Sequence, residues 1–287
     1  MQNQGTSVVS RPPLLRALGD REPPTEVVVD GKTYHRELVF KHDSWAATAL
    51  YREDGGIQIT CKFNRQASIF GLPMKWLGRR LARRETWFLR RLGGLGIAPD
   101  HMGEVYVDGE PQEHAVARRY IPGAPLFKHQ RVQDDFFPRL FAAVDSMHER
   151  GIAYVDLNKK ENIVVGDDGR PYLVDFQIGF RQPDSWLGRR GLYRGLFLQL
   201  ALMDRYHVYK HLADCRPDLA TPEELRRGRE PPRVIRMLRV PADRLRYLRR
   251  RLLVAMGVRS GSGLSRTESD PEDAVRRSIQ SSKRSSE

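Results

Sequence analysis

Two short apolar runs separated by a tight-turn signal constrain the fold of this sequence more than any other feature. The runs cover 163–165 and 172–174, and Gly166-Asp-Asp-Gly169 stands between them. This pattern predicts a β-hairpin, because the chain must reverse at the turn. Asp156 precedes the first run and Asp175 directly follows the second, so the hairpin should bring the two carboxylates together.

Oxygen-bearing side chains at the ends of neighbouring strands are suited to phosphoryl transfer. That reaction needs one residue to position an attacking hydroxyl group and others to hold Mg²⁺. Asp156, Asn162 and Asp175 have these functional groups. The sequence therefore predicts a magnesium-dependent phosphotransfer site.

Composition limits the classes of protein to be considered. The 287 residues are 40% hydrophobic, which fits one or two packed units. Cys61 and Cys215 are far apart and form no C-x-x-C pair, so we expect neither a disulfide framework nor a zinc site, and a cytoplasmic location. The N-terminus lacks the apolar segment of a signal peptide, and polar residues interrupt the longest apolar run, 192–203, so no membrane span is predicted.

The net charge of +13 indicates a polyanionic partner. Nucleic acid, anionic lipid and phosphorylated substrates all have the required charge. The sequence does not interleave aromatic and basic residues in the way that proteins stacking on bases do, so nucleic acid is the least expected of the three.

The first half of the chain is predicted to be an antiparallel sheet with one helix. A flexible leader is expected over 1–25. Strands are predicted at 27–29, 35–41, 45–52, 56–63, 102–107 and 114–120, and a helix at 73–92.

The pattern changes to helices after Pro122-Gly123. Helices are predicted at 134–150, 185–203, 205–212 and 242–256, and a disordered tail rich in Ser and Arg at 259–287. The fold class is therefore α+β.

Glu85 is an anomaly in the helix predicted at 73–92. It lies on the apolar stripe of that helix, where a carboxylate without a partner carries a desolvation cost of several kcal/mol. Lys62, at the end of a predicted strand, is a suitable partner from outside the helix. A surface lysine and a glutamate paired with a nearby arginine would explain the two residues equally well if each were taken alone.

The order of these features resembles that of the protein-kinase-like phosphotransferases. A strand lysine, a helix glutamate, a Pro-Gly hinge, a helix, Asp and Asn, and then Asp-Phe follow one another over 57–177. The resemblance implies a two-lobed fold, with a small nucleotide-gripping lobe at 26–121 and a minimal, mostly helical catalytic lobe at 122–258.

The resemblance also implies a role for each site residue. Lys62 and Glu85 would form the lysine–glutamate pair that holds the inner phosphates, and Asp156 would be the catalytic-loop aspartate. Asp175 would be the main Mg²⁺ ligand and Asn162 the second. These five residues imply ATP and Mg²⁺ as cofactors.

The same resemblance places the adenine of ATP against the hinge, at Arg119, Tyr120 and Ile121. No glycine-rich loop G-x-G-x-x-G appears at 40–45, so Ser44 and nearby backbone groups would have to cover the phosphates.

Three further departures from the family pattern lie near the aspartates. Tyr154 replaces the usual histidine, and Asn162 lies six residues beyond Asp156 where the family has five, so Asn158 is an alternative ligand. Gln177 follows Asp-Phe in place of Gly, which predicts a stiffer segment.

The sequence leaves the acceptor open between three classes. Asp-Leu-Asn in the catalytic loop and Asp-Phe-Gln resemble the bacterial lipopolysaccharide core kinases that act on Kdo or heptose. A phosphorylated, acidic glycolipid would then be the acceptor, and the enzyme would be a cytoplasmic monomer in peripheral contact with the inner face of the membrane. The helix at 242–256 could hold it there or could pack on the large lobe.

A RIO-type atypical serine/threonine protein kinase is the second class, for which the serines of the tail offer sites of self-phosphorylation. A non-catalytic kinase-like fold that binds polyanions is the third. Eukaryotic-type protein kinases have an Ala-Pro-Glu tripeptide followed by a large helical subdomain. Thr221-Pro-Glu is the only similar tripeptide here, and too little ordered chain is expected after it to build that subdomain.

Overall fold

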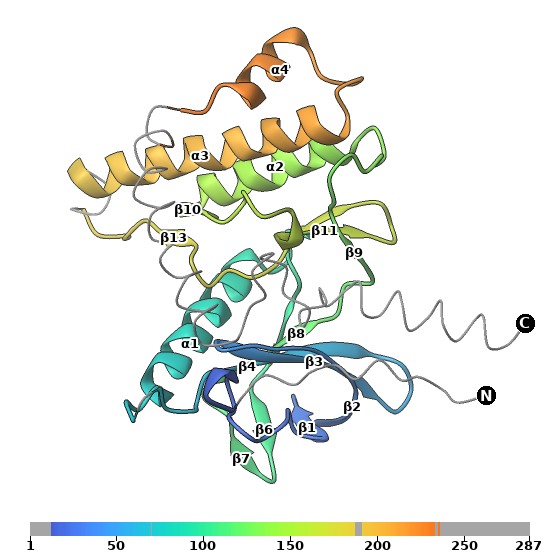
Figure 1. Cartoon of the computed structure of the whole chain (residues 1–287), viewed down its shortest axis with the longest axis vertical. Helices are drawn as coiled ribbons and strands as arrows, with labels where there is room; N and C mark the ends of the chain where they lie inside the picture. The colour runs from blue at the N-terminus through green and yellow to red at the C-terminus, as the bar shows by residue number, and fades with distance from the viewer. Residues whose placement is uncertain (1–12, 70, 187–190, 233–234, 236–287) are drawn as a thin grey trace, which may run out of the picture. The chain divides into compact units, whose positions relative to one another are not determined.

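The computed structural model describes residues 13–69, 71–186, 191–232 and 235, and the chain divides into two compact units (Figure 1). Within these residues, the first unit holds 13–83 and 102–118 and the second holds 84–101 and 119–235. The α+β class is confirmed, because an antiparallel sheet comes first and most of the helical residues follow.

The first unit is built on an eight-stranded sheet in the order β5-β8-β4-β3-β2-β1-β6-β7. Its strands are β1 (Glu26–Val29), β2 (Lys32–His42), β3 (Ala46–Glu53), β4 (Gln58–Asn64), β5 (His101–Gly103), β6 (Val105–Val107), β7 (Glu110–Pro111) and β8 (Ala115–Arg119). The first four form the predicted antiparallel meander. The strand predicted at 102–107 is instead two strands, because Gly103 has a φ of +125°.

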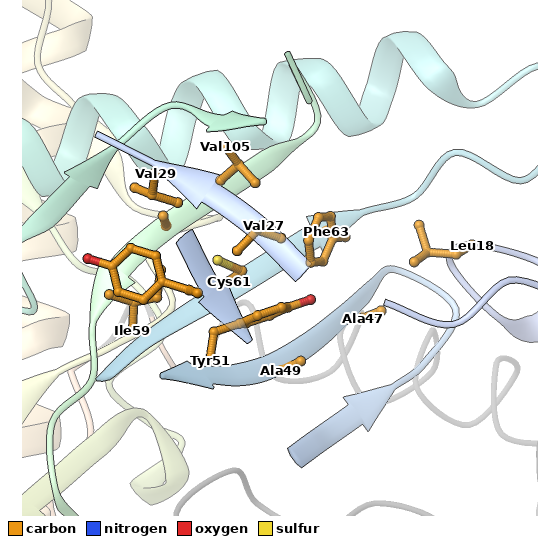
Figure 2. Packing of buried hydrophobic residues seen from close by; sticks show 12 residues of the cluster. Leu18, Val27, Val29, Ala47, Ala49, Tyr51, Ile59, Cys61, Phe63 and Val105 are labelled. Carbon is orange, nitrogen blue, oxygen red and sulfur yellow. The ribbon is translucent and has the colours of Figure 1, made fainter. Parts of the chain in front are cut away.

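The sheet curls back on itself. β5 lies at one end of the strand order and β6 pairs with β1 near the other end, although Glu104 alone separates β5 from β6 in the sequence. Figure 2 shows the apolar residues enclosed by this sheet, among them Tyr51, Cys61 and Phe63. Burial raises the pKa of the Cys61 thiol, so this cysteine serves as a protonated core residue.

Residues 13–25 differ from the flexible leader that we expected. Ala17 and Leu18 are buried, and the Ala17 amide donates to the Asp43 carbonyl at 2.7 Å. The buried Arg65 guanidinium donates to the Leu14 carbonyl at 2.9 Å. This arginine needs carbonyl acceptors in the interior, and the segment provides two of them, from Leu14 and Arg16.

The second unit contains the C-terminal part of α1 (Lys75–Leu92) and three further helices, α2 (Phe136–Glu149), α3 (Gly191–Cys215) and α4 (Pro222–Arg229). Its short strands are β9 (Gly123–Pro125), β10 (Ile152–Ala153), β11 (Ile163–Gly166), β12 (Pro171–Leu173) and β13 (Phe180–Arg181). The predicted hairpin is confirmed as β11 and β12, and β9 pairs with the other edge of β11.

The two helices predicted at 185–203 and 205–212 are wrong as separate elements. Within the described residues they are one helix, α3, which runs without interruption through Asp204. The helix predicted at 242–256 and the tail at 259–287 lie outside the described residues. Over the described ranges no helix has both the length and the apolar character needed to cross a membrane, α3 with its 25 residues included.

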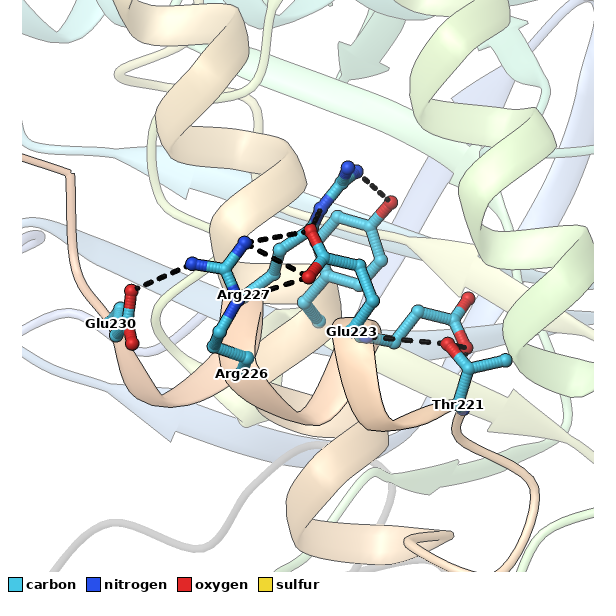
Figure 3. A network of polar contacts seen from close by, with 7 residues as sticks. Thr221, Glu223, Arg226, Arg227 and Glu230 are labelled. Carbon is cyan, nitrogen blue, oxygen red and sulfur yellow. Dashed lines mark hydrogen bonds and ion pairs between the residues drawn. The ribbon is translucent and has the colours of Figure 1, made fainter.

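Helix α4 begins with a capping box that the sequence analysis did not use. The Thr221 hydroxyl accepts from the Glu224 amide at 3.3 Å, and the Glu224 carboxylate accepts from the Thr221 amide at 2.8 Å. Figure 3 shows this N-terminus and the ion pairs of Glu223 with Arg226 and Arg227. Thr221-Pro-Glu is therefore a helix start.

Candidate active site

Asp156 lies in an irregular loop between β10 and the short 3₁₀ helix Lys160–Asn162. Its side chain is 16% exposed and forms an ion pair with Lys159, whose Nζ lies 2.6 Å from Oδ2. The Asn162 amide nitrogen donates to the same oxygen at 3.0 Å. Asp156 and Asn162 are therefore in direct contact, and Lys159 is a third polar residue that the sequence analysis missed.

The hairpin register brings Val174, the residue before Asp175, opposite Asn162. Ile163 on β11 pairs with Leu173 on β12, and the Val174 amide donates to the Asn162 carbonyl at 3.0 Å. Asp175 is the next residue and has a φ of +64°, in the left-handed region that is uncommon for residues other than glycine. The hydrogen bond at the end of the β11–β12 hairpin therefore links the segment of Asn162 to the segment of Asp175.

Asn162 and Asn158 have different surroundings. Asn162 is buried, and its amide nitrogen also contacts the Asp156 carbonyl at 3.3 Å. Since the nitrogen makes both contacts to Asp156, the side-chain oxygen is the atom that a metal ion would meet. Asn158 is exposed, and its side-chain oxygen accepts from Lys210 at 3.2 Å.

Asp204 on α3 holds the loop ahead of Asp156. Its carboxylate is fully buried and accepts from the amides of Tyr154, at 2.7 Å, and Val155, at 2.8 Å. His148 on α2 contacts the same carboxylate at 3.1 Å. Asp204 was not predicted from the sequence, although its neighbours at helical spacing include Leu200, Ala201 and Val208, the kind of apolar surroundings that had marked Glu85.

His211 fixes the loop on the other side of Asp156. Its Nε2 donates to the carbonyl of Leu157 at 2.7 Å. Burial lowers the pKa of His211 to about 4, so the ring is neutral near pH 7. The main chain on both sides of Asp156 is therefore attached to α3.

Tyr154 and Phe176 form the apolar support of the site. The Phe176 ring stacks on Phe88 of α1 at 6.0 Å between centroids and meets the Tyr154 ring edge-on at 5.2 Å. The Tyr154 hydroxyl donates to the Val174 carbonyl, which precedes Asp175. Tyr154 thus ties the loop of Asp156 to the residue ahead of Asp175.

The remaining predicted residues are placed as follows. Lys62 lies on β4 opposite Thr48 of β3 and is buried, and Glu85 lies on α1 and is also buried. They belong to different units, so their pairing stays a prediction. The hydroxyl of Ser44, which we expected near the phosphates, donates to the Leu15 carbonyl at 3.1 Å.

The hinge residues follow one another at the start of the second unit's main segment. Arg119 is exposed and its Nε lies 3.5 Å from the Asp100 carboxylate. Tyr120 is buried and Ile121 is half-buried. Their contact with adenine stays a prediction.

The donor set of the hairpin end fits Mg²⁺. Asp175 offers a carboxylate and Asn162 an amide oxygen, and Mg²⁺ commonly takes one or two carboxylates together with water and substrate phosphates. Among the described residues there is no group of three or more His, Cys, Asp or Glu side chains that could hold a metal ion on its own. The phosphates of a nucleotide would therefore have to complete the site.

Comparison with known proteins gives only a distant likeness. No protein-family model matches the chain, and no curated protein matches it. Two solved structures of the Rio2 kinase from Chaetomium thermophilum are similar to it at 15% sequence identity. One is an ADP/Mg²⁺-phosphoaspartate complex with a TM-score of 0.44, covering 65% of this chain. The other has a TM-score of 0.40 and covers 67%. The match spans 57% of each Rio2 chain, less than two thirds of its length.

Proposed function

We propose that this protein is an ATP-dependent phosphotransferase that moves the terminal phosphate to a hydroxyl group. The observation that supports the proposal is the hairpin register, in which Val174, the residue before Asp175, bonds to Asn162 while the side-chain amide of Asn162 contacts Asp156. Phosphoryl transfer requires a residue that positions the attacking hydroxyl and oxygen ligands that hold the metal ion close to it.

Each residue has a distinct role in this proposal. Asp156 orients the acceptor hydroxyl and takes its proton, and Lys159 compensates charge next to it. Asp175 and Asn162 hold Mg²⁺, which when bound neutralises charge on the terminal phosphates of ATP. Lys62, fixed by Glu85, holds the inner phosphates, and the hinge at 119–121 takes the adenine.

The acceptor that we propose is a hydroxyl of a phosphorylated sugar, such as one in the lipopolysaccharide core. The net charge of +13 supports an acidic acceptor, because long-range attraction raises the encounter rate with anions. Such an acceptor would bring the protein into peripheral contact with the inner face of the cytoplasmic membrane.

ATP consumption by the full chain, measured with a panel of sugar and protein acceptors, tests the proposal. Asp156→Asn should lower turnover by about 100-fold or more, as expected for loss of a general base, and should leave ATP binding intact. Asn162→Ala should lower turnover by at least about tenfold and raise the Mg²⁺ requirement. Asn158→Ala is the matched control and should stay close to wild type.

The possible outcomes separate the candidate functions. Full phosphotransfer by Asp156→Asn, or equal losses in the two asparagine variants, would contradict the assigned roles. Phosphate incorporation into the chain's own serines would favour a protein kinase. Salt-sensitive binding to anionic vesicles or nucleic acid with no ATP turnover would favour a non-catalytic protein.

A further inference from the structure

A second polar site lies within the second unit. It is a pocket of about 220 Å³. The residues that line it are Trp87, Arg91, Arg150, Arg181, Gln182 and Asp184. Nothing in the phosphotransfer chemistry proposed above uses these residues.

The pocket has an excess of two positive charges. Three guanidinium groups line it with a single carboxylate, and that carboxylate, Asp184, is paired with Arg181 at 2.7 Å. Arg150 donates to the Ser146 carbonyl at 3.0 Å. Over the described residues neither Arg91 nor Arg150 has a carboxylate partner, so both can accept an anion from outside the chain.

Arg181 is held in a fixed position. Its guanidinium lies 4.4 Å from the centre of the Trp87 ring, a cation–π contact that orients its plane. The ion pair with Asp184 restrains the same group from a second side. These two contacts restrain the Arg181 side chain before a ligand binds, which lowers the entropy cost of binding.

Favourable interaction with helix dipoles explains the positions of two of the three arginines in the pocket, but not the third. Arg91 stands in the last turn of α1 and Arg150 at the C-terminal cap of α2, where cations are favoured by the helix dipole. Arg181 is on a strand, and it completes a cluster from three elements. Arginine clusters of this kind suit phosphate, which they bind through paired, charge-assisted hydrogen bonds.

The pocket is close to Asp156 along the backbone. Arg181 on β13 pairs with Ile152 on β10, and the Gln182 amide donates to the Gly151 carbonyl at 2.8 Å. Asp156 follows Ile152 by four residues, which at about 3.3 Å per residue is at most about 13 Å. The pocket and Asp156 therefore belong to neighbouring parts of the second unit.

We propose that this pocket binds a phosphate monoester carried by the acceptor and so selects acceptors that are already phosphorylated. The inference rests on the proposed function, since it names the class of substrate for that site. The volume of about 220 Å³ is below the range of about 300–1,000 Å³ that holds drug-sized ligands, so the pocket fits a phosphate and its attachment point.

Calorimetric titration of the full chain without ATP or Mg²⁺ tests the pocket by itself. Glucose 6-phosphate and inorganic phosphate are the probes. Arg91→Gln and Arg150→Gln should each weaken binding of glucose 6-phosphate by at least about tenfold, because each removes a charge-assisted phosphate contact. Arg90→Gln is the matched control, since Arg90 is exposed in the same helix turn and does not line the pocket.

The results have distinct meanings. Equal weakening by Arg90→Gln, or no binding of either probe at millimolar concentration, would overturn the proposal. Glucose 6-phosphate should bind more tightly than inorganic phosphate, and equal affinities would refute the part that concerns an acceptor. If phosphate binds but no acceptor supports ATP turnover, the pocket stands and the phosphotransfer proposal fails. If turnover is found with acceptors that lack phosphate and is insensitive to Arg91→Gln, the phosphotransfer proposal stands and the proposal for the pocket fails.

Discussion

Replacing Asp204 by asparagine should destabilise the second unit and the loop of Asp156 together. The carboxylate is fully buried and accepts from the amides of Tyr154 and Val155 and from His148. An asparagine keeps one acceptor oxygen but turns an NH₂ group toward at least one of these donors. That donor would then be buried without a partner.

The magnitude follows from these contacts. A hydrogen bond to a charged group contributes about 1.5–3 kcal/mol, and a buried donor left without a partner costs about 1–3 kcal/mol. One bond lost and one donor left unpaired together give about 2.5–6 kcal/mol.

Guanidinium unfolding of the full chain, followed by far-ultraviolet circular dichroism, measures this free energy. The matched control is Asp145→Asn, since Asp145 pairs with Arg205 at 3.1 Å and both side chains are exposed. The control should lose less than about 1 kcal/mol. A loss below about 1 kcal/mol for Asp204→Asn as well would show that this carboxylate does not anchor the loop.

Two further predictions concern stability. Gly195→Ala and Gly228→Ala should have opposite signs, because an alanine Cβ at Gly195 meets no atom within 4 Å, whereas at Gly228 it would lie 2.6 Å from the Tyr209 carbonyl oxygen. Gly195→Ala should raise the unfolding free energy by about 0.5–1 kcal/mol, and Gly228→Ala should lower it by about 1–3 kcal/mol. Thermal unfolding of the two variants measures these changes, and changes of the same sign would contradict the prediction. Acid should also destabilise the protein, because burial lowers the pKa of His211 to about 4 and that of His207 to about 3, below the value of about 6.5 in an unfolded chain. The unfolded state then binds more protons, so the unfolding free energy should fall as the pH drops below about 6.5. His211→Gln should make the unfolding free energy less dependent on pH in denaturation measured across pH. An unchanged dependence would rule out His211 as a cause of the acid destabilisation.

Local patterns predicted the elements that carry the site. The hairpin at 163–174 was predictable because its turn residues and the flanking apolar runs are adjacent in the sequence. The strands at 26–64 were predictable for the same reason. Asp156, Asn162 and Asp175 could be named because each is close to one of these strand ends.

Contacts between distant segments could not be predicted in this way. Separate helices were predicted on either side of Asp204, but one helix continues through it, and its carboxylate is bound to loop amides about 50 positions earlier. The arginine pocket likewise joins α1, α2 and β13, which no local pattern connects. The proposal of Asn162 over Asn158 as a metal ligand also depended on the contact to Asp156.

The attachment of the Asp156 loop to α3 has a consequence for its motion. Tyr154 and Val155 belong to no helix or strand, and loop amides of that kind usually exchange their hydrogens with solvent quickly. Both donate to a carboxylate with no solvent exposure, so deuterium can reach them only when α3 separates from the loop. These amides should therefore exchange as slowly as those of the helix itself, and the loop of Asp156 should loosen only when that helix does.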